Sequence, residues 1–196
     1  MKILFIRFSS IGDIVLTTSP LRSLKKGIPN AQIHYLTLEE YAPLLEGNSS
    51  IDRLHLLVRS TSVGQLISVG NYLNHCNFDI VVDMHDSLRS KIIRNRIKSG
   101  THYYLKKPRW KRFKLFEFHQ NDFQNDFSQL TLFHSVIKDI LPQEYHSSTS
   151  LFVSENEKEE AKLLLSKNGI KGEKYLVCIP GAAWSNKTWE TTNYLE

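Results

Sequence analysis

Small, hydroxyl and acidic residues follow the first apolar run of the chain and form its first candidate site. The stretch RFSSIGDIVLTTSP places Ser9, Ser10, Gly12 and Asp13 between this run and a helical pattern. In a parallel α/β sheet, ligands bind at the carboxyl ends of the strands, next to helix N-termini. Gly12 allows close backbone approach, and Asp13 places one carboxylate where the helix dipole favours an anion. A second interpretation is that Ser10 or Asp13 only caps the helix.

A second candidate site is the stretch PGAAWSNKTW, which follows the apolar run YLVCI and precedes another helical pattern. Gly181, Ala182 and Ala183 have small side chains, so a phosphate could reach the backbone N–H groups of this turn. Lys187 would contact the same phosphate. An ordinary turn with a surface lysine also explains these residues.

The basic residues are concentrated in one segment. Eleven of the 25 lysines and arginines lie between Arg89 and Lys114, where no acid occurs, and the other fourteen are outnumbered by the 20 acids. We therefore expect an acidic body with a local site for an anionic partner. The candidate contacts for that partner are five cations: Arg59, Arg89, Lys106, Lys107 and Arg109.

Three interpretations of the segment 89–114 stay open. Trp110, Phe113, Leu115 and Phe116 lie among or next to the bases, which suits a membrane surface carrying anionic groups. A solvated helix face followed by a loop is the second interpretation. Nucleic acid is the third, but no RNP or helix-turn-helix pattern accompanies the bases, so we expect no nucleic-acid partner.

Cofactor and metal signatures are missing from the sequence. It has neither the GxGxxG of dinucleotide-binding folds nor a Walker loop, and no DxD motif. The two cysteines, Cys76 and Cys178, are far apart, and the eight histidines show no metal-ligand spacing. We expect no cofactor and no metal. His85 and Asp86 end a predicted strand and either line the cleft or serve the structure.

Apolar β-rich runs alternate with helical patterns along most of the chain. This alternation predicts an α/β fold with a parallel sheet covered by helices on both faces, and we place the first strand at its centre. The predicted strands are 2–8, 32–38, 51–57, 78–85 and 102–107, with a further one in KYLVCI (174–179). The predicted helices are 13–28, 39–47, 63–76, 87–97, 127–141 and 155–168.

We divide the chain into three parts. Residues 1–150 form a Rossmann-like domain, 151–172 an interdomain helix and linker, and 173–196 the leading edge of a second domain whose remainder lies outside the chain. The 196 residues alone are expected to be incomplete and inactive. The apolar start MKILFIRF is too short for a signal sequence, and no uncharged run reaches the ~20 residues of a membrane span. We therefore expect a cytoplasmic protein.

Three stretches together resemble the family 9 glycosyltransferases, the bacterial heptosyltransferases of the lipopolysaccharide inner core. They are KILFIRFSSIGDIVLTTSPLRSLKKGIPNAQIHYL, FDIVVDMHDSLRSK and IPGAAWSNKTWE, in the family's order. Three positions depart from the family pattern: its proline of the first helix usually falls at Ser19 rather than Pro20, a hydroxyl residue is common at Ala183, and a proline at Glu190.

The resemblance implies the N-terminal domain of a GT-B glycosyltransferase that inverts the transferred sugar. It implies Asp13 as catalytic base, acceptor contacts from Ser9, Ser10 and Gly12 together with the five cations, and donor phosphate contacts from Gly181, Ala182, Ala183 and Lys187. The implied donor is an ADP-heptose type nucleotide sugar. The implied acceptor is a lipid A–sugar at the inner face of the inner membrane, which the protein would contact peripherally.

A function of another class also fits the sequence. In it, the chain is a non-catalytic Rossmann-type module that binds anionic lipid or nucleic acid through the segment 89–114. Neither the transferred sugar, the acceptor hydroxyl nor the oligomeric state follows from the sequence.

Overall fold

The computed structural model describes residues 1–98, 100–123, 127–141, 148–170, 172, 174–179, 181–182 and 188–194. The chain divides into two compact units, Met1–Phe152 and Val153–Glu196.

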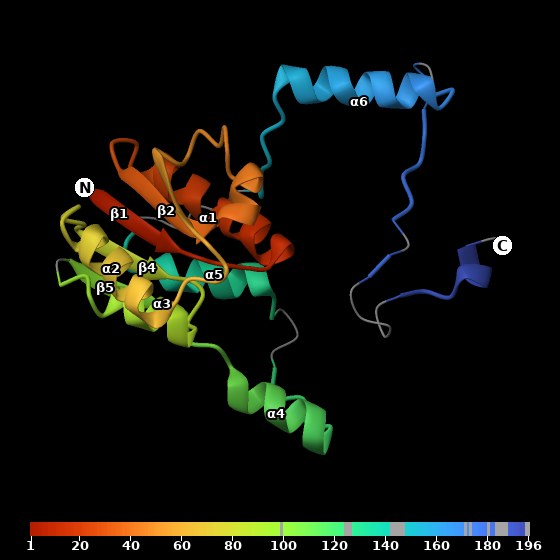
Figure 1. The fold of residues 1–196 in the computed structure, drawn as a ribbon. Helices are drawn as coiled ribbons and strands as arrows, with labels where there is room; N and C mark the ends of the chain where they lie inside the picture. The colour runs from red at the N-terminus through yellow and green to blue at the C-terminus, as the bar shows by residue number, and fades with distance from the viewer. Residues whose placement is uncertain are drawn as a thin grey trace. The chain divides into compact units, whose positions relative to one another are not determined.

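The first unit is built on a five-stranded parallel sheet with the strand order β3-β2-β1-β4-β5 (Figure 1). The strands are β1 (Lys2–Ile6), β2 (Gln32–Leu38), β3 (Arg53–Leu57), β4 (Ile80–Asp83) and β5 (Thr101–Tyr104). The predicted α/β fold and the central position of the first strand are confirmed. The run Ile3–Ile6 is fully buried, as expected for a strand that is covered on both faces.

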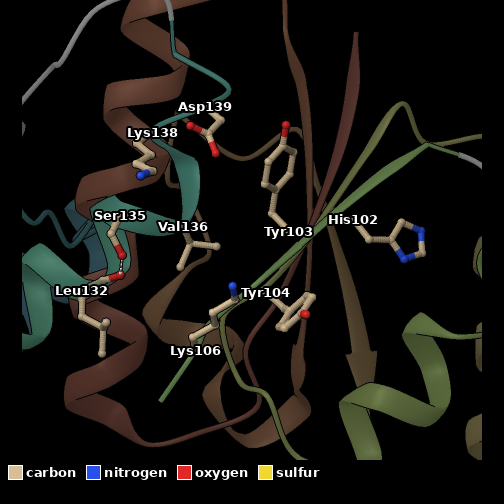
Figure 2. A pocket seen from close by; sticks show the side chains of 9 residues that line it. All are labelled: His102, Tyr103, Tyr104, Lys106, Leu132, Ser135, Val136, Lys138 and Asp139. Atoms are coloured by element: carbon tan, nitrogen blue, oxygen red, sulfur yellow. Dashed lines mark hydrogen bonds between the residues drawn. The ribbon is translucent and has the colours of Figure 1, made fainter. Parts of the chain in front are cut away.

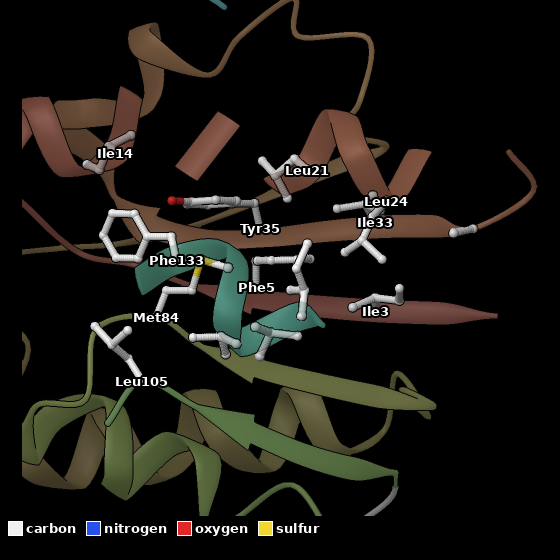
Figure 3. Packing of buried hydrophobic residues seen from close by; sticks show 14 of the residues in the cluster. Ile3, Phe5, Ile14, Leu21, Leu24, Ile33, Tyr35, Met84, Leu105 and Phe133 are labelled. Carbon is white, nitrogen blue, oxygen red and sulfur yellow. The ribbon is translucent and has the colours of Figure 1, made fainter. Parts of the chain in front are cut away.

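Helices cover both faces of the sheet. On one face, alternate residues of β1 and β2, such as Phe5 and Tyr35, pack against α1 (Ile11–Gly27) and α5 (Gln129–Ile137) (Figure 3). On the other face, Leu4, Ile6 and their neighbours pack against α2 (Val63–Asn74) and α3 (Leu88–Arg94). Successive strand side chains point to opposite faces, so the uninterrupted apolar run of β1 contributes to both core clusters.

Serine caps set the starts of several helices. Ser62, Ser87, Ser128 and Ser154 each accept a backbone N–H of the first turn of α2, α3, α5 and α6 (Glu155–Lys167). β4 ends two residues earlier than predicted because the Asp83 carboxylate accepts the N–H groups of His85 and Asp86, at 3.0 and 2.9 Å. These bonds turn the chain away from the sheet.

Two elements differ from the predicted helices. The predicted helix 39–47 is a 3-10 helix, η1 (Glu39–Leu44). The basic segment contains a helix that the sequence analysis did not delimit, α4 (Arg109–Phe118), which has no buried residue.

The second unit contains α6 and a short 3-10 helix, η3 (Thr191–Tyr194). The strand predicted for 174–179 is wrong for this structure, since none of these six residues is in a strand. Their apolar side chains are largely exposed, Leu176 at 93% and Ile179 at 83%. A strand needs a hydrogen-bonded neighbour, and the described residues of this unit supply none.

Candidate functional site

The chain places its first candidate site at the carboxyl ends of β1 and β4. These strands are neighbours, and the strand order reverses between them. From β1, the strands β2 and β3 extend the sheet in one direction, and the strands β4 and β5 extend it in the other. Open α/β sheets bind ligands at this topological switch point. The turn from β1 into α1 and the turn from β4 into α3 therefore define the site.

Asp13 lies in the first turn of α1 with its side chain 29% exposed. Its Oδ2 accepts hydrogen bonds from the N–H and Oγ of Ser10, at 3.4 and 3.1 Å, and lies 2.5 Å from Nη2 of Arg7. Among the described residues, Oδ1 has no hydrogen-bond partner. The geometry thus supports the capping interpretation through one oxygen and leaves the other oxygen for a ligand.

Arg7 is a site residue that the sequence analysis missed. Only 6% of it is exposed, and its guanidinium donates to the carbonyl oxygens of Ser9 and Met84, both at 2.6 Å, besides pairing with Asp13. Its guanidinium carbon lies 5.3 Å from the ring centre of Phe133 in α5. Burial lowers the pKa of Arg7, against the opposing effect of Asp13. The signal in the sequence was a lone arginine inside the apolar run KILFIRF.

His85 follows β4 and packs against Phe8, with ring centroids 5.0 Å apart. Burial lowers its pKa to about 4, and the charges of Arg7 and Lys107 act in the same direction. The imidazole is therefore neutral at pH 7, and its buried Nδ1 has no hydrogen-bond partner in the part of the chain that the structure describes. His85 thus adds a neutral polar ring to a site whose charges come from other residues.

Asp86 contacts three cations of the basic segment. It has a positive φ of 45°, and its carboxylate lies 3.2 Å from Nζ of Lys91 and 3.8 Å from Nη2 of Arg109. Its carbonyl oxygen accepts hydrogen bonds from Lys107 and Arg109, at 3.4 and 3.3 Å. Lys107 is half-buried, and among the described residues it has no carboxylate partner. Burial, followed by the charge of Arg7, lowers its pKa.

Arg89 and Arg59 also lie at this edge of the sheet. Arg89 donates to the carbonyl oxygen of Val58 at 3.2 Å, and its guanidinium carbon lies 5.7 Å from the ring centre of Phe8. Its buried Nε has no hydrogen-bond partner within the described ranges. Arg59 follows β3 and pairs with Glu40. Its charge is therefore largely compensated, whereas Arg89 retains donor capacity for an anion.

Lys106 does not join this group. It lines a hollow of about 510 Å³ between β5 and α5, and Asp13 is not among the lining residues (Figure 2). The hollow is also lined by His102, Tyr103, Tyr104, Leu132, Ser135, Val136, Lys138 and Asp139. Neighbouring residues of an extended chain point in opposite directions, so Lys107 contacts Asp86 and Lys106 faces the other side.

The helix α4 exposes aromatic and basic side chains together. Trp110, Phe113, Phe116 and Phe118 are 46–75% exposed, and the rings of Trp110 and Phe113 stack 5.4 Å apart. The bases and the rings alternate around the helix instead of lying on separate faces. None of the helices in the described part of the chain is long and apolar enough to cross a membrane.

The donor-side prediction is only partly covered by the structure. Gly181 and Ala182 are exposed residues of the second unit. Ala183 and Lys187 lie outside the described residues. Within the described ranges, no three His, Cys, Asp or Glu residues are grouped as a metal site would require.

Comparisons with known proteins bear on this geometry. A family model described as glycosyltransferase family 9 (heptosyltransferase) matches residues 66–196, well over half of the chain. Lipopolysaccharide heptosyltransferase 1 of Campylobacter coli is 24% identical over 199 aligned residues, which cover 98% of this chain and 58% of that protein.

Solved structures agree with the fold. The glycosyl transferase family 9 protein from Veillonella parvula DSM 2008 superposes with a TM-score of 0.79 at 20% identity, over 98% of this chain and 57% of that one. The ADP-heptose lps heptosyltransferase II of E. coli superposes with a TM-score of 0.63 at 18% identity, over 88% and 52%. The chain spans little more than half the length of these relatives, and the structural likeness at such identities shows the fold alone.

Proposed function

Because the chain belongs to glycosyltransferase family 9, the heptosyltransferase family, we propose that it transfers heptose from an ADP-activated donor to the inner core of lipopolysaccharide, with inversion at the anomeric carbon. The observation that carries this proposal is the Asp13 carboxylate at the topological switch point, held through Oδ2 with Oδ1 unpartnered among the described residues. The names of the relatives support the donor and acceptor: one is a lipopolysaccharide heptosyltransferase and another an ADP-heptose lps heptosyltransferase.

In the proposed reaction, Oδ1 of Asp13 takes the proton of an acceptor hydroxyl. The hydroxyl oxygen then forms a bond to the anomeric carbon, while the bond from that carbon to the diphosphate oxygen breaks on the opposite face. The electron pair leaves with the diphosphate, so ADP is the second product. No general acid is needed besides this base, because the diphosphate is a weakly basic anion that leaves without being protonated.

The donor would be held by the second domain. We propose that residues 1–150 bind the acceptor, that 151–172 connect the domains, and that 173–196 begin the nucleotide-sugar side. Backbone N–H groups near Gly181 and Ala182, and the side chain of Lys187, would stabilise charge on the leaving diphosphate. The support is the match of the family model through residue 196.

The acceptor would be anionic and would lie at a membrane surface. Arg89 and Lys107 are cations with unused donor capacity at the same edge of the sheet as Asp13, and such groups bind phosphates and carboxylates. The exposed rings and bases of α4 support contact with a lipid headgroup layer. We therefore propose that the protein acts on a lipid A–sugar acceptor as a peripheral membrane protein at the inner face of the inner membrane.

The test is turnover by the complete gene product, with ADP-heptose as donor and a deacylated lipid A–sugar as acceptor. We expect Asp13→Asn to reduce kcat by about 10²–10⁴-fold, the usual contribution of a positioned general base. Asp122→Asn is the matched control, because it makes the same change at an acid that pairs with Lys114 at the surface, and it should leave kcat unchanged. Normal turnover by a folded Asp13→Asn protein would exclude Asp13 as the base.

The non-catalytic alternative rests on the eleven bases of residues 89–114. The structure weakens it, because Lys91, Arg94, Arg109 and Lys114 pair with carboxylates of the described chain. Absence of sugar transfer with any nucleotide sugar, together with tight binding to anionic vesicles, would favour this alternative.

A further inference from the structure

A buried arginine at the end of a central strand needs an explanation. Arg7 is 6% exposed, in a position where the preceding four residues are apolar and fully buried. Charged side chains are almost never buried without partners, because desolvation of the charge is costly. The partners of Arg7 should therefore indicate why the charge is kept there.

The guanidinium connects three segments of the candidate site. Nε donates to the carbonyl oxygen of Ser9 in the turn after β1, and Nη1 donates to that of Met84 after β4, both at 2.6 Å. Nη2 pairs with Oδ2 of Asp13 in α1 at 2.5 Å. Because the guanidinium is planar and rigid, the first two bonds fix the direction in which Nη2 points.

These contacts restrict the orientation of the Asp13 carboxylate. Every hydrogen bond or ion pair of the Asp13 carboxylate with a described residue ends on Oδ2, two of them from Ser10 and one from Arg7. Rotation about the last side-chain bond of Asp13 would tilt the unpartnered oxygen out of position, and an ion pair whose guanidinium is held by two carbonyl groups opposes that rotation. A base must keep its accepting oxygen in place, since small misplacements of reacting groups reduce rates strongly.

We infer that Arg7 is a positioning residue for the proposed reaction: it holds Oδ2 of Asp13 so that Oδ1 faces the acceptor hydroxyl. This inference rests on the proposed function of Asp13. Arg7 itself does not touch the substrate; it acts through the carboxylate. Its effect should therefore be on kcat and should vanish when the carboxylate is removed.

The first experiment compares Arg7→Gln and Arg7→Lys in the complete gene product, with ADP-heptose and a deacylated lipid A–sugar as substrates. We expect Arg7→Gln to lower kcat about 100-fold, with both KM values changed less than threefold. Arg7→Lys should restore kcat to within about tenfold of the wild type, because an ammonium group can keep the ion pair without the other two bonds.

Arg94→Gln is the matched control. Arg94 is another arginine at this edge of the sheet, with 11% of its side chain exposed, and it pairs with the fully buried Asp83 at 3.1 Å. This variant should lower the melting temperature and leave kcat within threefold of the wild type. A loss of kcat that followed melting temperature in both variants would assign Arg7 a structural role only and overturn the inference.

The second experiment places Arg7→Gln in an Asp13→Asn background. We expect less than a threefold further loss of kcat, because residues that act as one unit have non-additive effects. Losses that multiply would show that Arg7 acts on the substrate directly. Normal kcat in Arg7→Gln with low kcat in Asp13→Asn would overturn the inference and leave the proposed function intact, whereas normal kcat in Asp13→Asn would overturn the proposed base. If Arg7→Gln fails to fold, Arg7→Lys carries the same comparison.

Discussion

Nδ1 of His34 lies 2.9 Å from Nε2 of His55, across the neighbouring strands β2 and β3. Both residues are 8% exposed, and the ring of Phe78 packs edge-on against His34. Burial is the main cause that lowers the pKa of both imidazoles, to about 4 for His55, and the charge of Arg53 acts in the same direction. The pair is thus kept neutral in the folded protein.

This pair predicts lower stability in acid. An unfolded histidine has a pKa near 6.5, so the unfolded chain binds protons that folded His55 refuses between about pH 6.5 and 4. The unfolding free energy should therefore have its highest value above pH 6.5 and fall as the pH decreases. The contribution of His55 alone should lower it by about 2 kcal/mol at pH 5. Urea denaturation at pH 7 and pH 5 measures the loss. His55→Gln should reduce it, and His119→Asn, at an exposed position, should not.

The contact between Arg7 and Asp13 predicts the stability of Asp13→Asn. An asparagine still accepts hydrogen bonds from Ser10, and as a helix cap alone it would replace aspartate with little cost. It leaves the buried guanidinium without its carboxylate, however, and loss of one partner of a buried pair is costly. Because Asp13 is 29% exposed, we expect a loss of about 2 kcal/mol in unfolding free energy.

Chemical denaturation of the folded variant tests this value. Asp122→Asn is the control, since Asp122 pairs with Lys114 at the surface and such pairs contribute about 0–1 kcal/mol. Equal stability of the two variants would mean that the buried position of Arg7 does not depend on the Asp13 charge.

The fold was largely predictable because local pattern and burial agree in it. The predicted strand 32–38 coincides with β2, and the helix predicted from the Ser-x-x-Glu motif at Ser154 begins at Glu155. The strand predicted for 174–179 failed because a β-rich run cannot form a ladder without a neighbour. Here the pattern was strong, but the described residues supply no pairing partner.

The site was predictable at its acid and not at its arginine. Asp13 stands out locally, since a glycine and two serines precede it at a strand end. The role of Arg7 depends on Met84, which is 77 residues distant in the sequence and adjacent only after β1 and β4 pair. The separation of Lys106 from Lys107 likewise required the path of the chain after β5.

The exposed rings of α4 predict binding to anionic membranes. Trp110 is 65% exposed and lies among four bases of the helix, and indole rings favour the interface between headgroups and acyl chains. Trp110→Ser should reduce sedimentation with vesicles that contain anionic lipid by about tenfold. Val63→Ser, at a similarly exposed apolar residue of α2, should leave it unchanged, and an equal effect of both changes would contradict a specific role for α4.

The adjacent lysines 106 and 107 allow a direct test of how the acceptor is bound. Lys107 is half-buried, donates to the carbonyl oxygen of Asp86 and has no carboxylate partner among the described residues, whereas Lys106 lines the separate hollow beside α5. An anionic acceptor at Asp13 should therefore pair with Lys107 and not with Lys106. Charge-assisted hydrogen bonds contribute about 1.5–3 kcal/mol, so Lys107→Ala should weaken acceptor binding by about tenfold or more.

Lys106→Ala removes the same charge one residue away and should change acceptor affinity less than twofold. Titration calorimetry with a deacylated lipid A–sugar at two salt concentrations measures both effects. Binding by the wild type should weaken as salt rises, because ions screen the attraction between the site and the anionic acceptor, and the Lys107→Ala protein should show a smaller dependence on salt. If both variants lose affinity equally, the basic segment attracts the acceptor only through its overall charge, and the placement of Lys107 at the site contributes nothing specific.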